Sequence, residues 1–286
     1  MNIEPQDATA SGCLYLVSTP IGNLEDITLR AIRVLKEADL IACEDTRQTQ
    51  KLMQHYGIHK KMISYHTHNE MTRAAELVIE LEKGGEVALL SDAGTPVVSD
   101  PGHRLITLCL RHHIPVIPIP GPSAFVAALS ASGLPVEEFS FVGFLPSRAG
   151  ARRKALENLK SEKRTIVMYE APHRLVETLA DAAAVMGPRP AVVAREITKI
   201  HEEFLRGNLL ELRDAAQQRA PRGEITLMIG PDDGTQQAAE VTISLKQRVE
   251  QLEAESGMDR KAALKQAARE RGLGKREAYK QLLIER

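Results

Sequence analysis

The sequence predicts an α/β protein made of two α/β domains followed by a small helical tail. Short apolar runs of about five residues alternate with amphipathic stretches of ten or more. Most of these runs end in a polar turn that contains glycine, proline or an acidic residue. Beyond residue 240 only helical patterns remain. A chain of 286 residues is long enough for two such domains and a tail.

The first domain is expected to span residues 13–120. Its apolar runs predict strands at residues 14–18, 39–43, 62–66, 86–90 and 115–119. Between them, helices are expected at residues 28–38, 46–56, 71–83 and 103–112. Strands that alternate with helices of this length indicate a largely parallel sheet.

A domain boundary is expected at the PGPS segment, residues 120–123, because two prolines around a glycine fix a bend. The second domain should span residues 121–232. Its expected strands cover residues 139–144, 165–169, 191–195 and 224–229. Its expected helices cover residues 123–132, 151–160, 172–186 and 209–219.

The two ends of the chain have other patterns. Residues 1–12 lack a clear pattern and are expected to be disordered. The tail, residues 241–286, predicts helices at 245–255, 260–271 and 275–284, and its last pair resembles a helix-turn-helix. Such a pair can bind RNA or pack as a plain helical hairpin. The tail carries 11 basic against 7 acidic residues, a net charge of +4 that favours RNA binding.

Composition excludes several classes of protein. Hydrophobic residues make up 43% and charged residues 26%, as in soluble globular proteins. No apolar run is long enough to span a membrane and no leader pattern is present, so a cytoplasmic protein is expected. The common dinucleotide, P-loop, zinc-protease and serine-hydrolase motifs are absent. His66 and His68 form a lone pair without a third ligand, so no metal site is expected.

Basic side chains gather in two places on this nearly neutral chain, whose net charge is −1. A localised contact with a polyanion would explain them, and a solvated helix face would explain them equally well. The candidate RNA-binding residues are Arg148, Arg152, Arg153, Lys154, Lys275 and Arg276.

Four loops that follow expected strands of the first domain carry most of its distinctive polar residues. They lie at residues 19–23, 44–47, 91–96 and 120–124. Because parallel strands share one carboxyl edge, these loops should open on one crevice. Asp92 can accept from hydroxyl or ammonium groups, and Gly94 allows close approach of the backbone to a ligand. An ordinary strand–helix turn with Asp92 as a cap is the alternative.

Five motifs occur in order along the chain: STPIGNL at 18–24, EDTR at 44–47, SDAGTP at 91–96, PGPSA at 120–124 and EITK at 196–199. In these motifs the sequence resembles the tetrapyrrole methylase superfamily of S-adenosylmethionine-dependent methyltransferases. It is most similar to the branch that methylates the ribose 2′-oxygen of a cytidine in bacterial 16S rRNA. The match runs from about residue 14 to residue 230.

The resemblance implies two domains that hold S-adenosylmethionine in the cleft between them, often within a homodimer. It implies an acceptor, cytidine 1402, in the decoding centre of 16S rRNA within the small ribosomal subunit. Carried over position by position, the expected donor contacts are Pro20, Ser91, Asp92, Ala93, Thr95, Pro96, Ser123, Ala124 and Tyr169.

A ribose hydroxyl is a weak nucleophile, so the site must align it, and a positioned base adds about 10²- to 10⁴-fold. Asp45 is the candidate base because it follows a strand at the crevice, and a helix cap is the alternative role. Glu44, Glu170 and Glu196 are less favoured bases, and Arg47 and Lys199 are able to position a phosphate or carboxylate.

Two other functions stay open from sequence. One is methylation of carbon in a tetrapyrrole of the precorrin type, which would need neither the basic clusters nor the tail. The other is a non-catalytic ribosome-assembly factor on the same fold. The five intact loops argue against the second, and a donor-binding measurement separates it from an enzyme.

Overall fold

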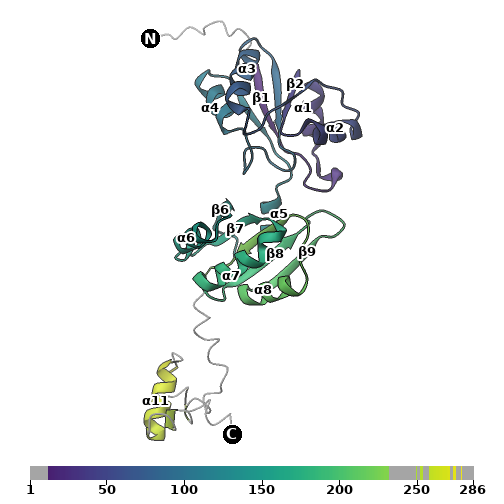
Figure 1. Ribbon diagram of the computed structural model, residues 1–286. Coiled ribbons are helices and arrows are strands. Elements are labelled where there is room, and N and C mark those ends of the chain that lie inside the picture. The colour runs from purple at the N-terminus through teal and green to yellow at the C-terminus, as the bar shows by residue number, and fades with distance from the viewer. Residues whose placement is uncertain are drawn as a thin grey trace, which may run out of the picture. The chain divides into compact units, whose positions relative to one another are not determined.

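The computed structural model describes residues 12–231, 249, 252–253, 258–270, 273–274 and 278. It is a mixed α/β structure, as the sequence predicts, and contains two five-stranded sheets (Figure 1). Contacts divide the chain into one unit, Met1–Pro231, that contains both sheets and a second unit, Asp232–Arg286. None of the helices in the described part of the chain is long and apolar enough to cross a bilayer.

The first sheet has the strand order β3-β2-β4-β1-β5, and all its pairings are parallel. Its strands are β1 (Cys13–Val17), β2 (Leu40–Cys43), β3 (Met62–Ser64), β4 (Glu86–Leu90) and β5 (Val116–Ile119). Its helices are α1 (Leu29–Glu37), α2 (Thr46–His55), α3 (Glu70–Glu82) and α4 (His103–Arg111), with a short 3₁₀ turn η1 (Leu24–Asp26). The expected parallel sheet is thereby confirmed.

Helices cover both faces of this sheet because successive strand residues point to opposite sides. On one face Leu89 of β4 packs with Leu77 of α3 and Leu105 of α4. On the other, Leu90 packs with Leu35 of α1 and other apolar residues of α1 and α2. Figure 1 shows the same arrangement, with α3 and α4 on one side of the strands and α1 and α2 on the other.

The second sheet has the order β6-β7-β10-β8-β9 and is mixed, since only β6 and β7 pair in parallel. Its strands are β6 (Phe139–Phe144), β7 (Thr165–Glu170), β8 (Pro190–Arg195), β9 (Glu203–Asn208) and β10 (Ile225–Ile229). Its helices are α5 (Ala124–Ser130), α6 (Ala149–Leu159), η2 (Pro172–Arg174), α7 (Leu175–Met186) and α8 (Leu209–Gln218). Helices α6, α7 and α8 cover one face and α5 contributes to the core on the other.

Strand β9 is absent from the sequence prediction. It is an edge strand, paired only with β8, and its residues are half-buried or exposed. An edge strand of this kind lacks the apolar run by which a buried strand is found.

In the second unit, helix α11 (Arg260–Glu270) confirms the helix expected at 260–271. Its buried face, Ala263, Leu264, Ala267 and Ala268, packs with Val249, Leu252 and Ala278. The other two expected tail helices and the candidate residues Lys275 and Arg276 lie outside the described residues, apart from isolated positions. Of the segment 1–12 that is expected to be disordered, only Gly12 is described; it is buried and its amide donates to the carbonyl of Leu81 at 2.8 Å, so the expectation is wrong for this residue. The domain limits at residues 120 and 232 stay predictions.

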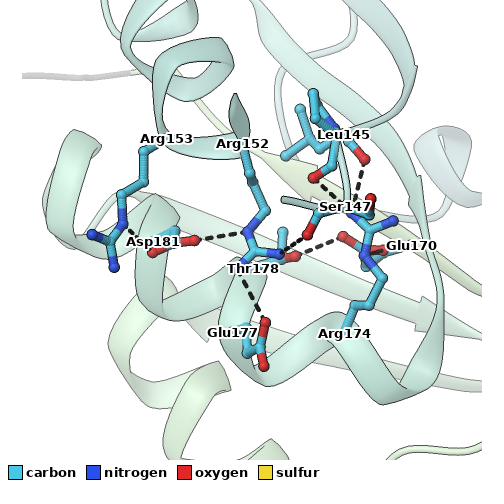
Figure 2. Close-up of polar contacts among 10 residues, drawn as sticks. Leu145, Ser147, Arg152, Arg153, Glu170, Arg174, Glu177, Thr178 and Asp181 are labelled. Atoms are coloured by element: carbon cyan, nitrogen blue, oxygen red, sulfur yellow. Dashed lines mark hydrogen bonds and ion pairs between the residues drawn. The ribbon is translucent and has the colours of Figure 1, made fainter. Parts of the chain in front are cut away.

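A buried ion-pair network joins α6 to α7 (Figure 2). The Nε of Arg152 lies 2.7 Å from Asp181, and both side chains are almost fully buried, at 2% and 6% exposure. Arg153, which is largely exposed, lies 2.6 Å from the other oxygen of Asp181. Burial alone would raise the pKa of Asp181, but the two guanidinium groups hold it below its ordinary value. Arg152 is thus part of the packing between these helices.

We expect Asp181→Ala to destabilise the fold by up to about 3–5 kcal/mol, because the buried Arg152 charge then keeps only Glu177, a largely exposed carboxylate 3.2 Å away. Arg153→Ala is the matched control and should cost less than about 1 kcal/mol, since that pair is exposed on one side. Urea unfolding of both variants checks this. Equal losses would mean that the Arg152–Asp181 pair contributes no more than a surface pair.

Candidate active site

The loops that follow β1, β2, β4 and β5 meet at the carboxyl edge of the first sheet. Thr19 and Gly94 exchange two backbone hydrogen bonds, of 2.9 and 3.0 Å. The amide of Asp45 donates to the Asp92 carboxylate at 3.0 Å. The hydroxyl of Thr95 donates to the carbonyl of Pro122 at 3.2 Å. The expected convergence of the four loops is therefore present as direct contacts.

A cavity of about 410 Å³ opens beside these loops. Its lining residues come from the loops of the first sheet and from the strands and loops of the second. Six expected donor-binding residues line it: Asp92, Ala93, Thr95, Ser123, Ala124 and Tyr169. Three others, Pro20, Ser91 and Pro96, are buried in the adjoining loops and are not among its lining residues. The hydroxyl of Ser91 donates to the carbonyls of Ala93 and Gly94, so it holds the shape of the loop.

The loop between β4 and α4 has a strained backbone. Gly94 has a φ of +82°, a conformation that glycine adopts without cost, and it forms the bridge with Thr19 there. Val97 and Ser99 also have positive φ, of 74° and 68°. A β-branched residue in this region is a real outlier, and such strain collects at functional sites. Val98, Ser99 and Asp100 of the same loop line the cavity.

Aromatic side chains from the second sheet form another wall. The ring of Tyr169 lies edge-on to Phe141, with ring centres 5.1 Å apart, and 5.6 Å from Phe144. Burial raises the pKa of the Tyr169 hydroxyl, so it stays neutral. This wall can pack against an apolar or aromatic part of a ligand.

Behind that wall, Glu170 ties the ends of β6 and β7 together (Figure 2). One carboxylate oxygen accepts from the Thr178 hydroxyl at 2.6 Å and the other from the Ala171 amide at 2.8 Å. Arg174 lies 3.2 Å from Glu170 and donates to the carbonyl of Leu145 at 2.7 Å. The Glu170 side chain is fully buried and held by these contacts, so it positions the cavity wall, of which Glu170 is itself a lining residue.

The structure does not support Asp45 as the base. Its carboxylate caps α2 by accepting from the Arg47 amide at 2.8 Å, and it pairs with the Arg47 guanidinium at 2.7 Å. Arg47 lowers the pKa of Asp45 to about 2. Neither residue lines a described cavity. The alternative that the sequence left open, a helix cap, is the role seen here.

Glu196 and Lys199 form an ion pair of 2.8 Å, and Lys199 also lies 3.2 Å from Glu224. The hydrogen bond from Lys199 lowers the pKa of Glu196. The stem of Lys199 packs on Gly22, where a Cβ would lie 2.3 Å from Cγ of the lysine. These residues join the two sheet-bearing halves at the rim of the cavity, which Glu224 and Ile197 line.

Sequence reasoning missed Asp100. It lines the cavity, is half-buried, and burial followed by the nearby Glu44 carboxylate raises its pKa to about 6. Burial and the charge of Asp92 also raise the pKa of Glu44. In the sequence, the only feature that sets Asp100 apart is its position before Pro101 and Gly102, in the long turn after β4. Only the fold brings it beside the other carboxylates.

The basic candidates of the second half differ in what they can reach. Arg148, Arg153 and Lys154 are exposed and available to a polyanion. Arg152 is buried against Asp181 and cannot contact RNA without breaking that pair, so it is withdrawn from the candidates.

Comparison with known proteins identifies the family. Residues 13–213 match the model of the Tetrapyrrole (Corrin/Porphyrin) Methylases. The chain belongs to this family. It is 52% identical over 224 residues to a Ribosomal RNA small subunit methyltransferase I of Halalkalibacterium halodurans, covering 78% of each chain. It is 47% identical to the Thermotoga maritima protein of the same name, over 76% of this chain and 98% of that one.

Solved structures agree on the fold. The chain is similar to a cobalt precorrin-4 methyltransferase, with a TM-score of 0.60 and 17% identity over 80% of this chain and 98% of that one. Family membership makes the chain a methyltransferase. S-adenosylmethionine, the donor that this implies, fits the cavity described here. The volume of the cavity lies within the range of small-molecule sites. Asp92 and Asp100 offer carboxylates to this donor, which has a net positive charge.

We expect Asp100→Asn to weaken S-adenosylmethionine binding by about 10- to 100-fold at pH 7.5, the value of one charge-assisted hydrogen bond. Because the pKa of Asp100 is about 6, wild-type affinity should fall as the pH drops through 6, whereas the variant should be insensitive there. Titration calorimetry between pH 5 and about pH 8 measures both.

Asp45→Asn is the matched control, because it makes the same chemical change in the loop after β2. It should leave donor affinity unaltered, since Asp45 does not line the cavity. A stronger effect at Asp45 than at Asp100 would contradict the assignment of the donor site.

Proposed function

We propose that the chain transfers a methyl group from S-adenosylmethionine to the 2′-oxygen of a cytidine ribose in 16S rRNA of the small ribosomal subunit, at cytidine 1402. The observation that carries this is the 44–52% identity, over about three quarters of the chain, to proteins named Ribosomal RNA small subunit methyltransferase I. A cytoplasmic protein that acts as a homodimer is part of the same proposal.

The cofactor supplies an electrophilic methyl group, and the chain must supply alignment and proton acceptance. Backbone and polar groups of the loops at residues 92–95 and 123–124 hold the donor, while Tyr169 packs against it. Alignment of the acceptor oxygen contributes several kcal/mol, as in other reactions in which two bound groups are held in line. Carboxylates with raised pKa values, and not the salt-bridged Asp45, are suited to take the proton.

Methylation of a tetrapyrrole is less well supported. The structural neighbours named for tetrapyrrole chemistry have 17–23% identity, at which similarity concerns the fold alone. Identity near 50% to proteins named for ribosomal RNA favours an RNA acceptor. A non-catalytic assembly factor would have no need of the donor cavity and its strained, specifically hydrogen-bonded loop.

Mapping of ribose methylation in 16S rRNA tests the proposal. Cells that lack the protein should lose one ribose methyl group, at cytidine 1402, and regain it with the wild-type gene. The Asp100→Asn gene should restore little of it, because donor binding is weakened. An unchanged methylation map in the deletion strain would refute the proposed acceptor.

Removal of residues 241–286 should leave donor affinity unchanged and impair methylation of small subunits. The donor cavity lies wholly within the first unit, whereas the tail adds positive charge for RNA. Calorimetry and a methyl-transfer assay on isolated subunits check both parts, and full activity without the tail would exclude it as an RNA-binding arm.

A further inference from the structure

A second cavity, of about 680 Å³, adjoins the donor cavity. It lies among the loops after β2, β3 and β4 and along the whole of α4, and polar side chains dominate its walls. Ser99 and Asp100 line both cavities. A ligand in the second cavity therefore lies next to the donor cavity, at Ser99 and Asp100.

The two sides of this cavity differ in charge. The acidic residues are Asp100 at the shared wall, Glu44 within electrostatic range of it, and Glu70 at the start of α3. On α4, Arg104 and Arg111 both line the cavity and are seven residues apart, which puts them on one helix face about 10 Å apart along the axis. Within the part of the chain that the structure describes, neither guanidinium has an ion-pair partner.

The N-terminal end of α4, which lies next to the shared wall, has no side-chain cap. Gly102 precedes the helix with a φ of 143°, and no side chain caps the first amides. A Cβ at Gly102 would lie 2.7 Å from Val97 and 3.0 Å from Leu89, so only glycine fits. The strained loop at 97–99 and this glycine together fix the start of α4 against the shared wall.

We propose that the second cavity binds the acceptor nucleotide, with its ribose at the Ser99–Asp100 wall and its phosphates on Arg104 and Arg111. Ribose hydroxyls donate to carboxylates such as Glu44 and Asp100, and phosphates pair with arginine. The volume fits one nucleotide in the range of small-molecule sites. This arrangement puts a ribose hydroxyl next to the donor cavity and makes Glu44 a proton acceptor at the acceptor site. The inference rests on the proposed RNA function and adds the residues that receive the substrate.

The test is the double variant Arg104→Ala/Arg111→Ala, assayed on small subunits from cells that lack the protein. Two lost phosphate contacts should lower the slope of log affinity against log salt by about 1.5–2 and raise KM at least about tenfold. Donor affinity should stay at the wild-type value, because neither arginine lines the donor cavity. The matched control is Arg30→Ala/Lys36→Ala, which removes two exposed positive charges from α1, on the other face of the sheet.

A salt slope and KM equal to those of the α1 control would overturn the inference.

Thr107→Trp supplies a second test, since it places a large ring in the second cavity from a half-exposed position on α4. It should abolish methyl transfer while donor affinity persists, and normal transfer by this variant would also overturn the inference. If wild-type protein transfers no methyl group to RNA, the proposed function itself fails. If it does and the variants behave as wild type, only the acceptor cavity is wrong.

Discussion

The reciprocal backbone pairing of Thr19 and Gly94 is the contact on which the site depends. It joins the loop after β1 to the loop after β4, two strands at the centre of the first sheet. Backbone hydrogen bonds between loops are stable when both loops emerge from the same rigid edge, as in a parallel sheet. With this pair in place, Asp92 and Thr95 lie where they can bond the neighbouring loops through Asp45 and Pro122.

The strained backbone of residues 97–99 is held in place by fixed residues on both sides. Val97 and Ser99 hold positive φ between the Gly94 pairing on one side and the tightly packed Gly102 on the other. Such conformations persist only where the surroundings fix them. Their consequence is that Ser99 and Asp100 face two cavities at once. One loop therefore borders both the donor cavity and the proposed acceptor site and supplies groups to both.

Several charged residues of the second sheet-bearing half hold its strands and helices together. Glu170, with Thr178 and Arg174, holds the strand ends beneath the aromatic wall, and Arg152 with Asp181 joins α6 to α7 (Figure 2). Buried charges are tolerated only when they are paired and hydrogen-bonded, which these are. A basic run in sequence thus contains both exposed residues and a residue of the core.

The sequence by itself determined the fold class, most of the elements and the loops that form the donor cavity. These follow from local information: the period of the apolar residues, the turn chemistry and motifs whose order along the chain is fixed. The helix cap at Asp45 is a local contact with the Arg47 amide, and the sequence already offered it as an alternative. Only the tertiary structure brings Asp100 to the cavity beside Glu44, because those two residues lie far apart along the chain. It likewise decided that Arg152 is buried and that β9 completes the second sheet. Burial, pairing and pKa depend on which groups meet in space, and a local pattern does not contain that.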